Sequence, residues 1–352
     1  MKTKIIKSIA IVIVFIGCSK EEPDIVPALS GSELQSVLKP PPPSNANPAF
    51  AFQDYFTQGN RSIPAIYVMD VTGANKTRVY SNYNNQSFQT PDYPAWSATG
   101  TQLCFTLNST DLYTLNIALV NGVPTGSGAT KIGNGVAGGG NYKQGKWRPG
   151  QNEIACVWKK TGDPDKIHLL PSAGGSPSVL YTAGTGWIIE DDIAFKSDGS
   201  NLVFSERQTS TGFVYLKVLD VAAGQVIQSI DLSQYKSVKE IDWAKSSGNS
   251  TVAITTRPLC DTSVIGLNDI HQLHTVDVSS PVPSLIWLKN DVGNISYSPD
   301  DLQITINSGL SRSSGGSGCS VSQYSGMRIL TIATMGITSP SYTGGNHHDW
   351  KR

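Results

Sequence analysis

The stretch that decides the fold of this chain runs Tyr93-Pro94-Ala95-Trp96-Ser97-Ala98-Thr99-Gly100 and leads into the apolar segment Gln102-Leu103-Cys104-Phe105. It places an aromatic residue before a polar turn, and that turn before an apolar strand. The same order returns with a period of about 50 residues. The later copies are centred on Trp147, Phe195, Trp243, Tyr297 and Trp350. An internal repeat of this length indicates a supersecondary unit that packs against its own copies.

Each repeat predicts four short strands: one ending at the aromatic, one after the turn, and two more. Ile66-Tyr67-Val68-Met69-Asp70 is a third strand of this kind, and a fourth follows around Thr77 to Tyr80. Four strands per unit are typical of a β-propeller blade, with the repeated aromatic packed between neighbouring blades. An unrelated β-sandwich does not explain the repeated order. The sequence therefore predicts an all-β, six-bladed propeller over residues 47–352.

The two ends of this region predict how the ring closes. The last copy, His348-Asp349-Trp350, stands at the end of the sequence, and Ala49-Phe50-Ala51-Phe52 forms what the pattern places as the next strand of the same blade. We therefore expect the last blade to be closed by N-terminal and C-terminal strands together. Such closure removes the exposed sheet edges that invite aggregation.

The repeats resemble those of TolB-like propellers, a WD40-like class of repeat. Its pattern is an aromatic, Ser-Pro-Asp-Gly, an apolar strand and then Ile-Tyr-Val-Met-Asp, which Ile66 to Asp70 spells out. The resemblance covers nearly everything after residue 47 and implies the fold rather than a function. TolB carries an α/β domain before its propeller, where this sequence shows only a tether, so no role in a Tol system is implied.

Composition fits this fold and excludes some functions. The chain is 39% hydrophobic and 15% charged, with 34 glycines and 20 prolines, as expected of many short strands joined by turns. Its formal net charge is zero and it has no basic block, which argues against nucleic-acid binding. We expect a monomeric propeller.

The first residues predict a lipoprotein signal peptide over residues 1–17. Lys2, Lys4 and Lys7 precede the apolar run Ile9 to Ile16, and a small residue stands directly before Cys18. The apolar run is shorter than the roughly 20 residues of a transmembrane helix. We therefore expect cleavage and attachment to a membrane through lipid on Cys18. An uncleaved membrane tail is the alternative, and it also leaves the rest of the chain outside the cytoplasm.

Residues 18–46 predict a flexible tether without a core. Pro40 to Pro43 form a polyproline-like spacer within it. Ser19 to Asp24 resemble an export signal of surface lipoproteins, and an ordinary solvated linker explains them equally well. We expect an outer-membrane lipoprotein, with display on the cell surface and a periplasm-facing position both open.

The cysteines beyond Cys18 fall into two pairs. Cys260 and Cys319 lie in long loops at equivalent places of neighbouring blades, and an oxidising compartment favours a disulfide between them. Cys104 and Cys156 lie inside apolar strands of neighbouring blades. We interpret these two as buried free thiols, because disulfide geometry is demanding, although a shared interface is the alternative.

Alignment on the repeated aromatic predicts a polar ring at one mouth of the central channel. Three places before each aromatic stand the residues that we call the mouth ring: Tyr93, Gln144, Asp192, Glu240, Asn294 and His347. Carboxylate, imidazole and amide groups can together hold a divalent cation. His347 is a weak candidate for a metal ligand, since related propeller lyases present several histidines and this ring has one. A solvated polar funnel is the favoured interpretation.

Two loops are much longer than their counterparts, at Arg257 to Asp269 and at Gly309 to Gly326. Long loops on one face of a rigid scaffold usually carry recognition. We predict that ligand contacts there include Arg257 and Arg312, together with loop aromatics that either grip a ligand or pack locally. These aromatics are Tyr142, Trp187 and Tyr235.

No motif identifies a reaction. The sequence has no G-x-S-x-G elbow, C-x-x-C, Walker loop or H-E-x-x-H. The first hypothesis is therefore a membrane-anchored, non-enzymatic binding propeller for a protein, peptide or glycan. The rival class is a metal-dependent polysaccharide lyase or hydrolase with its site at the channel mouth. A third hypothesis is a structural partner within the cell envelope, resembling TolB in role as well as in fold.

Overall fold

The computed structural model describes residues 48–84, 87–135, 139–258, 271–280, 284–290, 292–308, 310–311, 323–324, 326–341 and 344–351. These residues belong to one compact unit, Pro42–Arg352. Cys18, the signal peptide, the tether, Cys260, Arg312 and Cys319 lie outside the described residues. Within the described ranges, no helix has the length and apolar character needed to cross a membrane.

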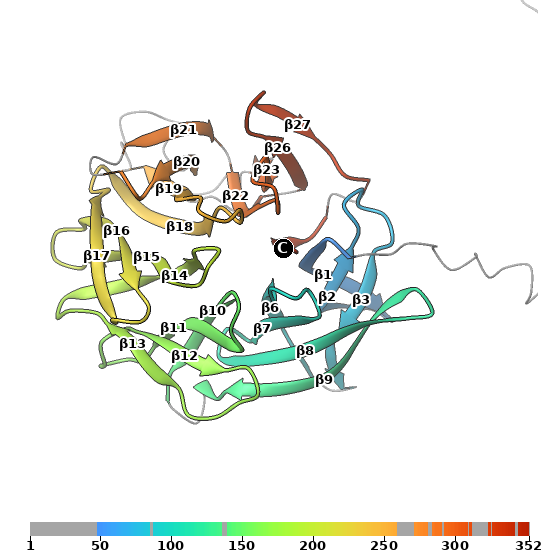
Figure 1. Ribbon diagram of the computed structural model, residues 1–352. Helices are drawn as coiled ribbons and strands as arrows, with labels where there is room; N and C mark the ends of the chain where they lie inside the picture. Colours follow the sequence, from blue (N-terminus) through green and yellow to red (C-terminus); the bar gives the residue numbers. More distant parts are fainter. Residues whose placement is uncertain are drawn as a thin grey trace, which may run out of the picture. The chain divides into compact units, whose positions relative to one another are not determined.

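The described chain forms six four-stranded antiparallel sheets arranged as the blades of a propeller (Figure 1). Blade 1 has the strand order β28 (Asn346–Trp350), β1 (Phe50–Gln58), β2 (Arg61–Met69) and β3 (Thr77–Tyr80). Blade 2 has β6 (Pro91–Trp96), β7 (Gln102–Leu107), β8 (Asp111–Val120) and β9 (Val123–Gly133). Blade 3 has β10 (Asn141–Trp147), β11 (Glu153–Lys159), β12 (Lys166–Pro171) and β13 (Ser178–Thr182).

The second half of the ring repeats this order. Blade 4 has β14 (Trp187–Phe195), β15 (Asn201–Gln208), β16 (Val214–Asp220) and β17 (Gln225–Asp231). Blade 5 has β18 (Tyr235–Trp243), β19 (Thr251–Pro258), β20 (Gln272–Asp277) and β21 (Leu285–Asn290). Blade 6 has β22 (Val292–Tyr297), β23 (Gln303–Ser308), β26 (Met327–Thr331) and β27 (Gly336–Thr338). Two short hairpins lie outside the blades: β4 (Asn82–Asn84) with β5 (Ser87–Gln89), and β24 (Leu310–Ser311) with β25 (Gln323–Tyr324).

The turn after the first strand of a blade repeats with the same chemistry. In blade 2, the Gly100 amide donates to the Ser97 carbonyl at 2.9 Å, and the Gln102 amide donates to the Ser97 hydroxyl at 3.1 Å. Gly100 has a φ of 64°, and Gly150 and Gly199 each have 71° at the same place. Glycine adopts this left-handed backbone without a Cβ clash. The glycine therefore marks this hairpin in blades 2, 3 and 4, and Asp301, with a φ of 60°, takes its place in blade 6.

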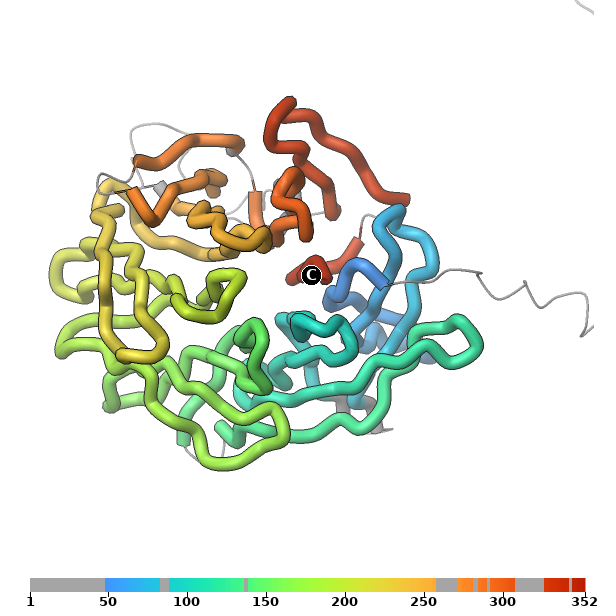
Figure 2. The backbone as a smooth tube through the Cα atoms, in the orientation of Figure 1, coloured from blue at the N-terminus to red at the C-terminus, as the bar shows by residue number. Residues whose placement is uncertain are grey.

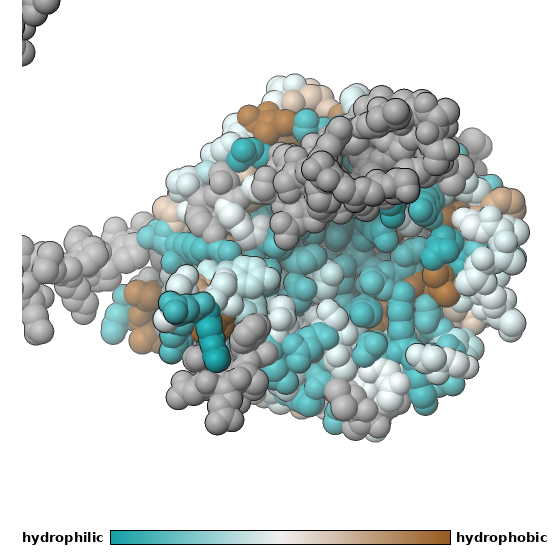
Figure 3. All heavy atoms as spheres, turned by 180° about the vertical axis from the view of Figure 1, so that it is seen from behind, coloured by the Kyte–Doolittle hydropathy of each residue, from teal (hydrophilic) through white to brown (hydrophobic). Residues whose placement is uncertain are grey.

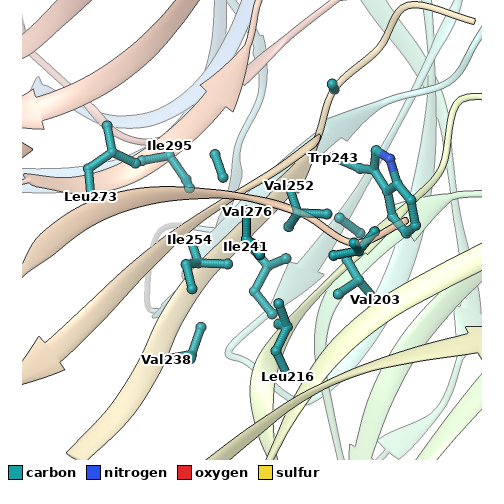
Figure 4. Close-up of a cluster of buried hydrophobic side chains, with 14 of the residues drawn as sticks. Val203, Leu216, Val238, Ile241, Trp243, Val252, Ile254, Leu273, Val276 and Ile295 are labelled. Atoms are coloured by element: carbon teal, nitrogen blue, oxygen red, sulfur yellow. The ribbon is translucent and has the colours of Figure 1, made fainter. Parts of the chain in front are cut away.

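The repeated aromatics pack between neighbouring blades, which confirms the prediction. All six are buried, and the indole Nε1 of Trp147 in blade 3 donates to the Ala95 carbonyl of blade 2 at 3.1 Å. The largest apolar cluster joins blades 4, 5 and 6 (Figure 4). Trp243 of blade 5 lies there beside Val203 of blade 4. The other four clusters lie between blades 3 and 4, 1 and 2, 2 and 3, and 1 and 6, so an apolar cluster joins every pair of neighbouring blades.

The predicted closure by both ends of the propeller is confirmed. Phe50 pairs with Trp350 across β1 and β28, and their rings lie 4.7 Å apart. The Lys351 amide donates to the Ala49 carbonyl at 2.7 Å. Figure 2 shows these two segments side by side near the centre of the ring. Blade 1 consequently holds the ring together through strands from opposite ends of the sequence.

Candidate functional site

A β-bulge interrupts the innermost strand of every blade at the mouth ring. The register with the second strand shifts between Asp92 and Ala95 in blade 2 and between Gly293 and Ser296 in blade 6, and the other four blades shift at the equivalent place. A bulge adds an unpaired residue and redirects the side chains next to it. The repeated β-bulge therefore sets the direction of the mouth-ring side chains.

Three of the six mouth-ring residues have left-handed backbone. Tyr93 has a φ of 52°, Asn294 has 48° and His347 has 53°. Asparagine and histidine tolerate this region better than most residues, but it is unfavourable for the bulky side chain of Tyr93. Residues held in such conformations cluster at functional sites, because the surrounding structure must hold them there.

Five of the six mouth-ring residues line one pocket, which we call the mouth pocket. Its lining consists of Tyr93, Pro94, Gln144, Gly145, Lys146, Glu240, Asn294, Ile295, His347 and His348. The pocket has room for about one water molecule, because the volume that the centre of a water molecule can occupy is about 20 Å³. Figure 3 shows hydrophilic side chains around a hollow in the middle of one face of the propeller. The pocket is thus polar, narrow and specific in shape.

Asp192, the sixth ring residue, is buried and anchors neighbouring strands. Its Oδ2 accepts from the Ile241 amide of blade 5 at 2.7 Å, and its Oδ1 accepts from the Ile193 amide at 2.9 Å. Glu240 shares a side-chain hydrogen bond with Asp192. Burial raises the pKa of Asp192 to about 6, and burial together with the charge of Asp192 raises the pKa of Glu240 well above its usual value. Burial and the charge of Asp192 therefore both favour the neutral form of the Glu240 carboxyl.

Lys146 supplies the positive charge at the centre of the channel. Its Nζ lies 3.6 Å from Asp192 Oδ1. Burial alone lowers the pKa of Lys146, but the carboxylates of Asp192, Asp349 and Asp242 outweigh burial and raise it above the usual value. Lys146 lines the mouth pocket and also a second pocket farther along the channel. Lys146 therefore stays charged, and it lies between the carboxylate of Asp192 and those of Asp242 and Asp349 at the second pocket.

The deeper level is a network of buried ion pairs that sequence reasoning did not find. Lys245 Nζ donates to the Trp350 carbonyl at 2.8 Å and to the Ser296 hydroxyl at 3.0 Å. It lies 3.8 Å from Asp242 Oδ2 and 3.7 Å from Asp349 Oδ1. The signal was present in the repeats, because Lys146, Asp242 and Asp349 each stand one place before the repeated aromatic.

His347 of blade 1 lies against Tyr93 and Asp92 of blade 2. Its Nε2 lies 3.4 Å from Asp92 Oδ1, its ring centroid lies 3.9 Å from that of Tyr93, and its buried Nδ1 has no hydrogen-bond partner. Burial lowers the pKa of His347 to about 3, helped by the charges of His348 and Lys146. Burial raises the pKa of Asp92 to about 7. His347 is therefore a neutral imidazole at physiological pH.

His348 lies on the other side of the same strand and is only 5% exposed. Its Nε2 lies 3.5 Å from the Gly344 carbonyl, and its buried Nδ1 has no hydrogen-bond partner. Burial lowers the pKa of His348 to about 4. The mouth pocket thus borders two neutral imidazoles, each with an unpaired ring nitrogen.

No protein-family model matches the chain, and no curated protein matches it in sequence. Solved structures do. A putative TolB from Agrobacterium tumefaciens aligns with a TM-score of 0.54 and 14% identity, over 85% of this chain and 91% of that one. TolB from Acinetobacter baumannii aligns with a TM-score of 0.56 and 13% identity, over 91% and 70%.

This chain folds as a TolB-like six-bladed β-propeller. At these identities the likeness establishes the fold alone. An oligogalacturonate lyase in complex with manganese also aligns, with a TM-score of 0.44 and 13% identity over 85% of this chain and 73% of that one. That similarity is too weak to carry a metal or a reaction over to the TolB-like propeller.

The metal hypothesis gains no support from the described part of the TolB-like propeller. Across the described ranges, no group of three or more His, Cys, Asp or Glu side chains is arranged to hold a metal ion. His347 faces Asp92, while the carboxylates of Asp192 and Asp242 are already occupied by backbone amides. The carboxylates of Asp192 and Asp242 therefore bond neighbouring blades to each other.

The loop aromatics of the TolB-like propeller have different surroundings. Tyr142 is 4% exposed, and its hydroxyl lies 3.4 Å from Nδ1 of His168, while its role as a ligand contact stays a prediction. Its position at the start of an inner strand tucks the ring between blades. Trp187 and Tyr235 are half-buried, beside Tyr215 and His274 respectively, and remain predictions as ligand contacts. Arg257 is likewise half-buried, near the end of β19.

Cys104 and Cys156 are buried free thiols, as interpreted from the sequence. Both belong to the apolar cluster between blades 2 and 3 of the TolB-like propeller, and Cys104 Sγ lies 3.3 Å from the Gly145 carbonyl. Burial raises the pKa of both thiols above the usual value. They are therefore packing groups with little thiolate character.

Proposed function

We propose that this chain is an extracytoplasmic binding protein, anchored to a membrane through lipid on Cys18, whose propeller receives a ligand at the mouth pocket. The observation that carries the proposal is the left-handed backbone of Tyr93, Asn294 and His347 around one polar pocket. The backbone of Tyr93 is unfavourable for a bulky side chain, and residues held in such conformations cluster at functional sites. Binding of a ligand is a function that such strain supports.

The ligand classes that suit this site are a protein, a peptide or a glycan. The narrow mouth pocket takes one small group, so we propose that most contact with a macromolecule falls on the surrounding face and includes Trp187, Tyr235 and Arg257. The sequence-based prediction of Arg312 as a ligand contact is kept. A protein ligand within the envelope corresponds to the role of structural partner, and a polymeric sugar corresponds to the lyase or hydrolase alternative. We place the chain in the outer membrane, facing either the periplasm or the cell exterior.

Capture of envelope components tests this proposal. The full chain, immobilised in detergent solution, is incubated with a membrane extract of its source cells, and retained proteins and glycans are identified by mass spectrometry. Gln144→Trp places a bulky ring in the mouth pocket, and we expect it to abolish retention of a specific ligand. Gln151→Trp is the matched control, because Gln151 lies in the exposed hairpin at the opposite end of the same inner strand.

Equal retention by the wild type and Gln144→Trp, with both melting at the same temperature, would contradict a binding site at the mouth. Divalent metal is included in a parallel incubation with acidic polysaccharides. Appearance of unsaturated or shortened products there would favour the enzyme over the binding protein.

A further inference from the structure

The hairpin formed by β8 and β9 ends in an apolar tip without charge. Leu119 and Val120 at the end of β8 are 55% and 52% exposed, and Val120 pairs with Val123 across a two-residue turn. No Asp, Glu, Lys, Arg or His occurs in residues 116–130. β9 is the outermost strand of blade 2, and proteins usually place charged side chains along such an edge. Adjacent exposed apolar side chains on an uncharged edge mark a surface that meets another apolar surface.

The hairpin is held firmly and reaches the neighbouring blade. β9, with 11 residues, is the longest strand of the described ranges, and its pairing with β8 runs from Gly133 to Val123. Figure 1 shows the hairpin reaching past β3 of blade 1. A Cβ on Gly126 would collide with the Val79 carbonyl of β3, so the two strands lie in close contact. The apolar tip is therefore presented beside blade 1 by a rigid support.

The strand directions place this tip at the end of the blades opposite the mouth pocket, which we call the turn end. β6 runs from Tyr93 of the mouth ring toward the turn end, β7 returns antiparallel to the mouth, and β8 runs to the turn end again. The chain enters the ring at the same end. Pro48, the first described residue, stands two places before Phe50, which pairs with Trp350 at the end of β28 away from the mouth. The segment that leads from Cys18 therefore joins the propeller at the turn end of blade 1.

Further exposed apolar side chains lie in turns at this end of blades 1 and 6. Val71 in the β2–β3 turn is 49% exposed, Leu302 in the β22–β23 turn 61%, and Met335 in the β26–β27 turn 41%. The turns at the mouth end of blades 1 and 2 are instead polar, with the sequences Gly59-Asn60 and Asn108-Ser109-Thr110. Three consecutive blades, 6, 1 and 2, thus carry exposed apolar turns at the end where the chain enters.

We infer that the tip of the β8–β9 hairpin, Leu119 to Val123, inserts into the lipid bilayer that anchors the chain, so that the mouth pocket faces away from the membrane. This inference rests on the proposed anchoring through Cys18 and adds the orientation of the propeller. Peripheral membrane segments bury apolar side chains about 5–10 Å into the boundary between headgroups and acyl chains. Charged groups resist such burial, and the hairpin has none between residues 116 and 130. The bilayer is favoured as the partner because the tether brings it to the same end of the ring.

Fluorescence quenching by brominated lipid tests the inference. The full lipidated chain is reconstituted into phosphatidylcholine vesicles with plain or brominated acyl chains, and flotation confirms that it is bound. Val120→Trp adds a fluorophore at the tip, and we expect bromination to remove at least about half of the emission that it adds over the wild type. Ser210→Trp is the matched control, because Ser210 lies in the exposed β15–β16 turn at the mouth end of blade 4, and its added emission should persist.

A second variant separates insertion from mere proximity to lipid. Leu119→Asp in the Val120→Trp background should restore most of the quenched emission, because a carboxylate is costly among acyl chains. Unquenched Val120→Trp in a chain that floats with the vesicles would overturn insertion and leave anchoring intact. A blue-shifted emission that bromination does not quench would indicate a second copy of the chain on the tip, which also overturns it. Equal quenching of Ser210→Trp would refute the orientation, and a chain that does not float would refute anchoring and insertion together.

Discussion

Lys146 and Lys245 are single residues that set the balance of charge in the channel. Lys146 is surrounded by carboxylates from other blades, and Lys245, 4% exposed along its side chain, lies between Asp242 of its own blade and Asp349 of blade 1. A buried charge without partners costs several kcal/mol. Removing Lys245 therefore takes away the cation that lies 3.8 Å from Asp242 and 3.7 Å from Asp349, and the same carboxylates accept from the Tyr297 and Trp96 amides of the next blades.

His348 makes the stability of the propeller depend on pH. Its pKa is about 4 in the folded chain against 6.5 in the unfolded chain, so the unfolded state binds more protons between these values. Stability attributable to His348 is complete above pH 6.5 and is lost as pH falls toward 4, by up to about 3 kcal/mol. We expect His348→Phe to remove this part of the acid sensitivity.

Urea unfolding at pH 7.5 and pH 4.5 measures the effect. Phe suits the site, because the ring of Phe52 lies 5.8 Å from that of His348. His347, with a folded pKa of about 3, continues to destabilise the variant in acid. An unchanged difference between the two pH values would show that His348 is not protonated on unfolding.

At the scale of elements, β28 and the bulges of the inner strands matter most. β28 joins blade 1 to the rest of the ring through Trp350, whose amide donates to the Ser296 hydroxyl of blade 6 at 3.0 Å and whose carbonyl accepts from Lys245 of blade 5. This five-residue strand of blade 1 thus bonds to blades 2, 5 and 6. The same strand also presents His347 to the mouth pocket, so closure of the ring and construction of the site depend on one element.

Truncation at Asp349 tests the contribution of β28. Removing residues 350–352 deletes a buried indole, and truncation of a buried tryptophan typically costs about 3–5 kcal/mol. We expect a melting temperature lower by several degrees and a broader transition, measured by circular dichroism. Removing only Arg352 is the control and should leave the melt unchanged. A melt that is insensitive to loss of Trp350 would refute the role of β28 in closing the ring.

At the scale of the whole molecule, the predicted lipid anchor decides where the mouth pocket meets its ligand. Cys18→Ala should abolish incorporation of labelled palmitate into the chain, because the thiol is the predicted acceptor. Cys260→Ala is the matched control and should retain the label. The measurement is fluorography of the immunoprecipitated chain. Label that persists in Cys18→Ala, or that is absent from the wild type, would contradict the lipoprotein assignment.

The repeated order of aromatic, turn and strand was enough to predict six blades, closure by both ends, and the residues of the mouth ring. This succeeds because a residue at a constant offset from the aromatic occupies the same place in every blade, so alignment of the repeats substitutes for structure. Asp192 is the one member of the mouth ring that does not line the mouth pocket, because two backbone amides hold its carboxylate.

By itself, the sequence determined the architecture and which strand positions face the channel, since periodicity is a local property of the chain. Only the tertiary structure decided that Lys146 and Lys245 occupy the channel, that Tyr142 is buried, and that His347 and His348 each keep an unpaired ring nitrogen. These facts depend on partners that come from different blades, as when Asp349 accepts from the Trp96 amide across 253 residues at 2.7 Å. The pairing of buried charges follows from which blades meet, and that is decided when the ring closes.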